Sequence, residues 1–151
     1  MNYTPEETAL KIGEKITAVD HRFLDMLGIE AEPFQPGRAV CHMTIREDML
    51  NSGKFCHGGF IFFLADNAFA YACLAKNQAM VTLSAHVIFT SAAKLGDRLT
   101  AIAQIMTQSG RTSSGDVEIV NQDGETVARF QGVAYWRKDP VLGAKKRKTE
   151  E

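Results

Sequence analysis

One apolar segment determines how the rest of the chain must fold: Gly58-Gly-Phe-Ile-Phe-Phe-Leu-Ala-Asp66-Asn-Ala-Phe-Ala-Tyr-Ala-Cys-Leu-Ala75. Its 16 residues from Phe60 are almost all apolar, with many alanines and no proline, which favours a helix over a strand. A helix that is apolar on every side is typical of a protein interior. The run is short for a bilayer span and carries Asp66 and Asn67 near its middle, so we expect a buried helix and no membrane insertion.

The sequence after this helix alternates between apolar and polar residues with a period of two. Turn signals separate the predicted strands, which cover 80–91, 97–109, 113–121 and 125–136, and a further strand is predicted upstream over 38–47. This order of elements predicts an α+β fold in which an antiparallel sheet wraps around one long central helix. Such a sheet leaves open edges and one uncovered face, so we expect the chain to self-associate.

Both ends of the chain differ from this central pattern. Thr4 and Pro5 form a good helix start, and we predict N-terminal helices within residues 5–28. We assign residues 1–137 to a single domain that includes these helices. From residue 138 the sequence turns polar, and we predict a flexible tail over 138–151.

Charge and composition argue against several classes of function. The 151 residues include 17 Lys and Arg against 18 Asp and Glu, which gives no basic surface for nucleic acid. The three cysteines form no Cys-x-x-Cys pair and indicate reduced thiols rather than disulfides. The N-terminus lacks the basic start and apolar core of a signal peptide. We therefore expect a cytoplasmic protein.

Asp66 is the most informative residue of the central helix. An ionised carboxylate inside a protein costs several kcal/mol unless it is paired or hydrogen-bonded, and no Lys or Arg lies between Phe55 and Ala75. Asn67, a backbone group or a water would satisfy a purely structural acid. The alternative is a functional carboxylate.

Gly58 and Gly59 support the functional alternative. Amide groups in the first turn of a helix lack intrahelical acceptors and lie at the positive end of the dipole, where they suit the oxyanion that forms when a carbonyl is attacked. Gly58 and Asp66 are eight residues apart, which is ~12 Å along a helix, and their directions differ by ~80°. A ligand and a water fit between them.

The segment from Asn51 to Cys73 closely resembles the active-site segment of the PaaI-like acyl-coenzyme A thioesterases, hotdog-fold enzymes associated with phenylacetate degradation. The resemblance rests on Asn51, then on Cys56-His57-Gly58-Gly59, Leu64-Ala65-Asp66 and Ala68-Phe69-Ala70-Tyr71-Ala72-Cys73 at the family's spacing. Weaker similarity continues, so that residues from about 24 to 136 are covered. The fold it implies is the hotdog fold, a sheet wrapped around one central helix.

The resemblance implies hydrolysis of an acyl-CoA thioester in a site shared by two subunits of a homodimer, with a homotetramer as the expected assembly. Asp66 is then the catalytic nucleophile or general base, and the Gly58 amide, with Gly59, polarises the carbonyl. Asn51 comes from the facing subunit. The acyl group is small, with an aromatic phenylacetyl type as one candidate. The resemblance implies no metal and no cofactor besides the coenzyme A of the substrate.

Four further residues are assigned to substrate binding. His57 lies in the motif and Asn67 follows Asp66. Phe63 suits an aromatic acyl group, although phenylalanines of a buried helix also serve as plain core. Arg111 lies in a turn with small hydrogen-bond donors and suits a phosphate of coenzyme A.

The sequence also departs from the family pattern and leaves alternatives open. The strand that often ends in Phe-x-Arg-Pro reads Phe89-Thr90-Ser91-Ala92 here, which bears on the substrate more than on the reaction. A Cys56–His57 nucleophile pair and a zinc site are weaker hypotheses, because the first needs correct orientation and the second a recognised spacing. Two other functions remain: an acyl-thioester hydratase or dehydratase, and a non-catalytic acyl-CoA binding protein.

Overall fold

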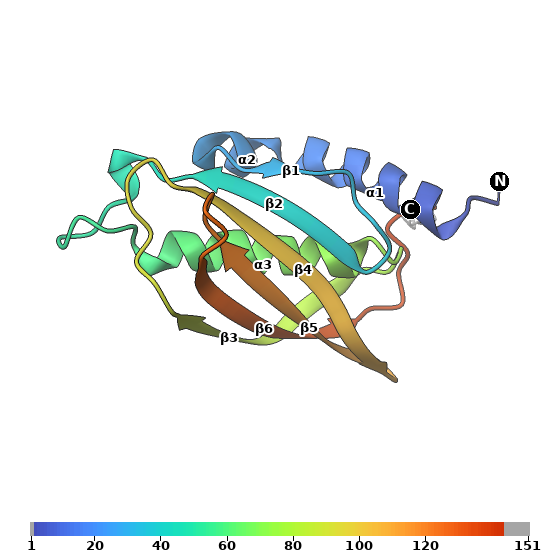
Figure 1. The fold of residues 1–151 in the computed structure, drawn as a ribbon. Coiled ribbons are helices and arrows are strands. Elements are labelled where there is room, and N and C mark those ends of the chain that lie inside the picture. The colour runs from blue at the N-terminus through green and yellow to red at the C-terminus, as the bar shows by residue number, and fades with distance from the viewer. Residues whose placement is uncertain (1, 144–151) are drawn as a thin grey trace, which may run out of the picture.

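The computed structural model describes residues 2–143, which form three α-helices and one six-stranded sheet (Figure 1). The helices are α1 (Pro5–Val19), α2 (His21–Leu27) and α3 (Gly58–Leu74). The strands are β1 (Glu30–Ala31), β2 (Arg38–Thr44), β3 (Met80–Phe89), β4 (Arg98–Ser109), β5 (Thr112–Val120) and β6 (Thr126–Trp136). The predicted central helix, the predicted N-terminal helices and the five predicted strands are all present, with ends that shift by up to three residues.

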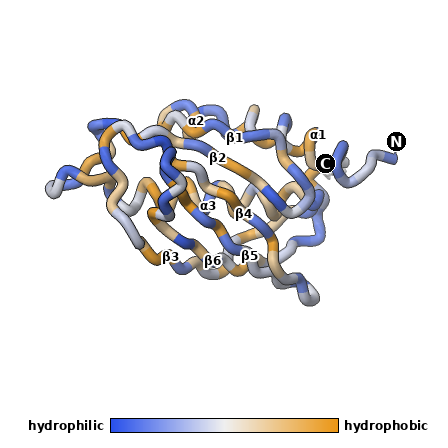
Figure 2. Tube along the Cα trace, in the orientation of Figure 1, coloured by the Kyte–Doolittle hydropathy of each residue, from blue (hydrophilic) through white to orange (hydrophobic). Residues whose placement is uncertain are grey.

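The sheet has the strand order β1-β2-β4-β5-β6-β3, and every neighbouring pair is antiparallel. It curves around α3, which contacts each strand from β2 to β6 (Figure 1). Hydrophobic and hydrophilic residues alternate along the strands (Figure 2), and buried positions alternate with more exposed ones in β4, β5 and β6, so one face of the sheet covers the helix. This is the predicted arrangement of a sheet around one helix.

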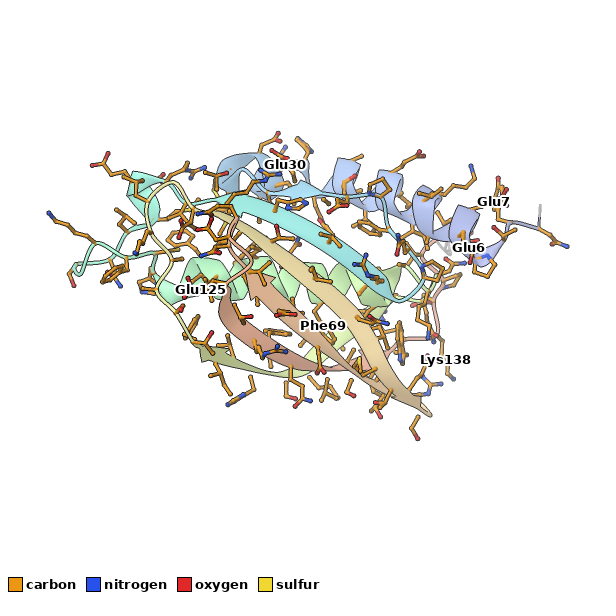
Figure 3. All side chains as sticks on the ribbon, in the orientation of Figure 1. Glu6, Glu7, Glu30, Phe69, Glu125 and Lys138 are labelled. Carbon is orange, nitrogen blue, oxygen red and sulfur yellow. The ribbon has the colours of Figure 1, made fainter. Side chains whose placement is uncertain are left out.

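Small residues let α3 approach the sheet closely. Gly115 of β5 and Gly132 of β6 lie side by side, and the ring of Phe69 fills the space above them (Figure 3). A Cβ on Gly132 would lie 2.6 Å from a Phe69 ring carbon, and a Cβ on Gly115 2.9 Å from another. Real Cβ atoms do not tolerate contacts this short, so these two glycines determine how deeply the helix packs.

Two elements escaped prediction because they are short. β1 contains only two residues and extends the sheet beside β2, with Glu30 opposite His42. The strand predicted over 38–47 ends at Thr44, and a 3-10 turn over Glu47–Met49 follows. Neither segment is long enough to show a period of two or of 3.6 residues.

The N-terminal helices pack beside α3 and are connected to it by specific contacts. The Tyr71 hydroxyl of α3 donates to Oδ2 of Asp20 at 2.8 Å, and the Tyr71 ring packs on Phe34 with centroids 4.8 Å apart. Lys15 of α1 donates to the carbonyl oxygen of Val141 at 2.6 Å. Residues 138–143, which the sequence places in the polar tail, are therefore partly packed against α1; residues 144–151 of that tail lie outside the described residues.

The edge strand β3 exposes apolar side chains that the other strands bury. Its exposed apolar residues are Val81, Leu83, Ile88 and Phe89. β6 occupies one of its sides, and within residues 2–143 no strand pairs with the other. An apolar edge of this kind is a ready surface for another chain. No helix among the described residues is long and apolar enough to cross a membrane.

Candidate active site

The exposed face of α3 carries Asp66. Asp66 and Phe63 lie one turn apart on this face, and Phe63 keeps 37% of its surface exposed. Asp66 is half-buried and makes no side-chain hydrogen bond or ion pair with any residue of the described part of the chain. Burial raises the pKa of its carboxyl above the ordinary value. Neither Asn67 nor a backbone group of the described residues satisfies the carboxylate, so a purely structural Asp66 would need a water as its partner.

The first turn of α3 presents one free amide. His57 caps the helix, because its Nδ1 accepts a hydrogen bond from the Gly59 amide at 2.9 Å. The Gly59 amide is therefore already hydrogen-bonded in this conformation, and its assistance to Gly58 stays a prediction. The Gly58 amide has no acceptor among residues 2–143. It is a single hydrogen-bond donor at the positive end of a long helix.

A cavity of about 470 Å³ opens beside this free amide. Its lining comes from the loop before α3, the first turns of α3, and the end of β3 with the loop that follows: Phe55, Cys56, Gly58, Ile61, Phe89, Thr90, Ser91, Ala92 and Ala93. The Phe89 ring lies directly against Gly58, where a Cβ would be 2.8 Å from Cζ. The family-atypical segment Thr90-Ser91-Ala92 therefore forms part of the wall, next to the free amide.

Cys56 and His57 do not form a nucleophile pair. The Cys56 thiol points to the carbonyl oxygen of His57, at 3.4 Å, while Nδ1 of the His57 ring is occupied by Gly59. Burial raises the pKa of the Cys56 thiol to about 11, so it is protonated at neutral pH. Among the described residues no group of three or more His, Cys, Asp or Glu side chains is arranged to hold a metal ion.

Asn51 shapes the loop that precedes α3. Its Oδ1 accepts hydrogen bonds from the amides of Gly53 at 2.9 Å and Phe55 at 3.2 Å. These two bonds fix the side-chain amide, and its Nδ2 has no partner among residues 2–143. The exposed loop thus holds an oriented hydrogen-bond donor, the property that the predicted role of Asn51 requires.

Asn67 lies away from the exposed face. It is only 8% exposed, and its Nδ2 faces Sγ of Cys41 in β2 at 3.9 Å. On a helix, consecutive residues differ in direction by ~100°, which turns Asn67 toward the sheet when Asp66 faces outward. The structure gives no support to its assignment as a substrate-binding residue in this conformation.

Arg111 lies at the opposite end of the molecule from Gly58. Its carbonyl accepts from the Trp136 amide, and Trp136 pairs with Met80 at the start of β3. Gly58 contacts Phe89 at the end of the same strand. Met80 and Phe89 are nine residue steps apart along β3, which is ~30 Å. Within one subunit Arg111 therefore cannot hold a substrate that is bound at Gly58.

Two aromatic residues near this site were not predicted as site residues. In the sequence Phe89 only begins the segment that departs from the family pattern, and its contact with Gly58 joins positions 31 residues apart. Phe23 of α2 packs edge-on against Phe63, with ring centroids 5.5 Å apart. No sequence pattern links residue 23 to residue 63, because the contact depends on how α2 docks on α3.

Comparison with known proteins places the chain in a family. The sequence model of the Thioesterase superfamily matches residues 53–128, the segment that contains the helix α3 and most of the sheet. The chain belongs to the thioesterase superfamily. The same segment holds Asp66, the free amide of Gly58 and the adjoining cavity, so the predicted family is confirmed on the elements that build the site.

Curated and solved relatives agree with this assignment. This thioesterase is 44% identical to the acyl-coenzyme A thioesterase PaaI of Escherichia coli over 72% of its own length and 78% of that protein. The solved structure of E. coli PaaI superposes with a TM-score of 0.85 at 37% identity, covering 89% of this chain and 96% of that one. The TT0310 protein of Thermus thermophilus superposes with a TM-score of 0.72 at 35% identity, covering 76% and 96%. The hotdog fold and the thioester hydrolase class predicted from the sequence are confirmed.

Proposed function

We propose that this thioesterase hydrolyses a small aromatic acyl-CoA of the phenylacetyl type to the free acid and coenzyme A, with Asp66 as the catalytic carboxylate. The observation that carries the proposal is that Asp66 is partly buried and unpaired among the described residues, two helical turns from the free amide of Gly58. The similarity to E. coli PaaI supports coenzyme A as the carrier of the acyl group.

The proposed reaction uses the two ends of one helix segment. The Gly58 amide donates to the thioester carbonyl oxygen and stabilises the oxyanion that develops on it, an interaction of ~3 kcal/mol for one donor. Because Gly58 and Asp66 of one chain are ~12 Å apart along the helix, Asp66 of that chain acts by taking a proton from a water that attacks the carbonyl carbon; direct attack on that carbon, forming an anhydride that water then cleaves, requires the Gly58 amide of the facing subunit. In both routes the C–S bond breaks and the coenzyme A thiolate leaves. Neither route uses a metal or a bound cofactor.

Partial burial of Asp66 favours its role as a base. A carboxylate with a raised pKa is a stronger base than an exposed one, yet it remains ionised when the pH exceeds that pKa. Its unpaired state keeps the lone pairs available for a water or a carbonyl carbon. Asn51, with a fixed and unpaired Nδ2, is proposed to orient the water or the substrate from the facing subunit.

A second copy of the chain is proposed to complete the site. β3 is an edge strand with exposed apolar side chains and it contacts α3, so pairing of two β3 edges is proposed to bring the exposed faces of two α3 helices together. The extension to a homotetramer of two such dimers rests on the family resemblance. A cytoplasmic location is proposed on the three cysteines, which are buried free thiols, as in proteins of a reducing compartment.

The hydratase or dehydratase alternative finds less support at this site. That chemistry pairs a histidine with an acid, and the nearest motif histidine, His57, uses its Nδ1 to cap α3. His42 bonds to Glu32 and Thr100 on the outer face of the sheet, away from α3. A binding protein without catalysis would leave the unpaired carboxylate unexplained.

A thiol-release assay over acetyl-CoA, phenylacetyl-CoA and octanoyl-CoA tests the proposal. We expect wild type to prefer phenylacetyl-CoA, and Asp66→Asn to keep the fold and to lose most turnover on every substrate. Asp116→Asn, which alters an exposed acid on the outer face of β5, is the matched control and should behave as wild type. Saturable binding without thiol release would establish the non-catalytic alternative, and near-normal hydrolysis by Asp66→Asn would refute the role of Asp66.

Single turnover in ¹⁸O water separates direct attack by Asp66 from attack by a water that Asp66 activates, because label enters Asp66 only through an anhydride.

A further inference from the structure

Two chain segments that are bonded to each other border the open cavity beside Gly58. The loop before α3 supplies Phe55 and Cys56 to the lining, and the segment after β3 supplies Ala92 and Ala93. The Cys56 amide donates to the carbonyl oxygen of Ala93 at 2.8 Å. Both segments lie at the end of the molecule where α3 begins (Figure 1). A ligand in this cavity therefore lies beside both of them.

Each of these segments carries one exposed lysine next to a residue of the cavity lining. Lys54 directly precedes Phe55, and Lys94 directly follows Ala93. The chain path between the two lysines is short, because two steps of ~3.8 Å lead from Lys54 to Cys56 and one such step leads from Ala93 to Lys94. Their long, flexible side chains can converge on one ligand at the edge of the cavity.

Neither lysine has a partner for its charge within residues 2–143. The two ammonium groups form no ion pair and no side-chain hydrogen bond with any of these residues. The carboxylate of Asp97 accepts the backbone amide of Lys94 at 2.8 Å and Nε2 of Gln122 at 3.0 Å. The carboxylate of Glu125 accepts the Ser91 hydroxyl at 2.5 Å. Both lysine charges are therefore free to bind an anion.

The cavity lining itself contains no charged residue. The position at which the family pattern often has an arginine is Ser91 here, and its hydroxyl bonds to Glu125. Arg111, the cation that the sequence assigned to coenzyme A, is separated from Gly58 by the length of β3, which is ~30 Å. Lys54 and Lys94 are therefore the unpaired cations that adjoin this lining along the chain.

Coenzyme A esters match this combination of a neutral cavity and two cations at its edge. The thioester is uncharged, whereas the phosphate groups at the other end of the pantetheine arm are anions. Lysine binds phosphate as a point charge on a flexible stem. We infer that Lys54 and Lys94 bind the phosphate groups of coenzyme A while the thioester carbonyl lies at the Gly58 amide of the same chain, an inference that rests on the proposed function.

The test compares phenylacetyl-CoA with phenylacetyl-pantetheine, which has the same thioester and no phosphate. The double variant Lys54→Gln/Lys94→Gln removes both charges and keeps two long, unbranched side chains. This choice suits Lys54, whose φ of 62° is equally unfavourable for either residue. We expect KM for phenylacetyl-CoA to rise about tenfold or more with little change in kcat, and both constants for phenylacetyl-pantetheine to stay at their wild-type values.

Controls separate the effect of charge from an effect on structure. Lys54→Arg/Lys94→Arg keeps both charges and should retain the wild-type KM for phenylacetyl-CoA. Lys138→Gln removes an exposed charge toward the other end of α3 (Figure 3) and should change neither substrate. Added salt should raise KM for phenylacetyl-CoA in wild type and much less in the Gln double variant. The inference is overturned if that variant changes both substrates by one common factor, changes neither, or alters the oligomeric state.

Calorimetric titration with free coenzyme A separates this inference from the proposed function, because binding of the product needs no turnover. We expect the Gln double variant to bind coenzyme A about tenfold or more weakly than wild type. If wild type releases no thiol, or if Asp66→Asn remains active, the catalytic assignment is wrong and the titration still tests the lysines. If Asp66→Asn is inactive and the Gln double variant binds coenzyme A like wild type, the catalytic assignment stands and this inference is overturned.

Discussion

The ring of Phe89 lies end-on against Gly58, so that a Cβ at position 58 would lie 2.8 Å from Cζ of Phe89 and 3.2 Å from both adjacent ring carbons. This contact joins the end of β3 to the first residue of α3. It fixes the free amide of Gly58 relative to the cavity wall, and it excludes any side chain at that position. Gly58 therefore combines two properties: its amide has no acceptor among the described residues, and its lack of a side chain permits the close contact with Phe89.

Gly58→Ala should lower both stability and activity. The added methyl group forces Phe89 or the helix start to move, at a cost of about 1–3 kcal/mol for overpacking. Because the displaced amide no longer meets the carbonyl oxygen well, kcat/KM should fall by about 100-fold. Thermal unfolding and thiol release measure the two effects.

The double variant Gly58→Ala/Phe89→Ala tests whether the clash with the Phe89 ring causes the losses of stability and activity in Gly58→Ala. Removing the ring takes away the clash, so the double variant should regain part of the lost Tm and of the lost kcat/KM relative to Gly58→Ala. Phe89→Ala alone is the control for the loss of the ring from the cavity. A Gly58→Ala variant with wild-type kcat/KM would show that the position of this amide is unimportant for the reaction.

The raised pKa of Asp66 predicts opposite pH effects on activity and on stability. Activity needs the ionised form, so kcat/KM should fall as the pH drops through the pKa of Asp66, at a pH above that of an ordinary exposed aspartate. Stability follows the other direction: since the folded-state pKa exceeds the unfolded one, the contribution of Asp66 is full below the unfolded pKa and is lost as the pH rises through the folded pKa.

Asp66→Asn should therefore be more stable than wild type at neutral pH. The amide removes the cost of a partly buried charge, and the difference in Tm should shrink toward zero as the pH falls and wild type becomes protonated. Calorimetric scans of both proteins from pH 4 to pH 8 measure this difference. Equal Tm values across the whole range would mean that Asp66 pays no desolvation cost in the assembled protein.

Local patterns in the sequence predicted most of the fold. The apolar run of α3 has only one compact solution, burial by a sheet, and the period-two segments after it supply four consecutive strands. Asp66 and Gly58 could be recognised together because a helix converts their spacing of eight residues directly into a distance. Such positions need no knowledge of the tertiary structure.

Positions that depend on docking were beyond the sequence. Arg111 was grouped with the site by its chemistry, yet the register of β6 and β3 places it at the far end of the sheet. Gly59 has the same chemistry as Gly58, but the rotamer of His57 occupies its amide. Phe23 reaches Phe63 only because Asp20 and Tyr71 set the position of α2. In each case a contact that no sequence pattern encodes decides what the residue can reach.

His57 should act through the structure of α3 rather than by proton transfer. Its Nδ1 accepts the Gly59 amide, so His57→Ala leaves that donor unsatisfied and should cost about 1 kcal/mol of helix stability. His57→Asn supplies another capping oxygen and should restore both the Tm and kcat/KM. An Asn variant that is folded but inactive would instead assign the imidazole a direct part in catalysis.

Asn51→Asp tests the amide nitrogen alone. A carboxylate keeps the acceptor for the amides of Gly53 and Phe55, so the loop should retain its shape and the Tm should stay near that of wild type. It loses the Nδ2 donor, and we expect kcat/KM to fall by about 100-fold. Asn51→Ala, which also loses the loop bonds, should be less stable as well as less active. If Asn51→Asp hydrolyses the substrate normally, the side chain serves only the loop.

Leu83→Lys tests whether two copies form the site. Leu83 lies in the middle of β3, at the point where the register with β6 shifts, and is 59% exposed. A lysine on an edge strand opposes strand pairing, so the variant should be monomeric at micromolar concentration by light scattering, with a normal circular dichroism spectrum. Leu95 is 58% exposed in the loop after β3, so Leu95→Lys is the matched control and should keep the assembly of wild type.

The same variant tests whether the site is shared. Because the proposed site needs Asn51 from the facing subunit, the Leu83→Lys monomer should lose at least about 100-fold in kcat/KM and regain activity as protein concentration rises. A fully active monomer would place the whole reaction within one chain.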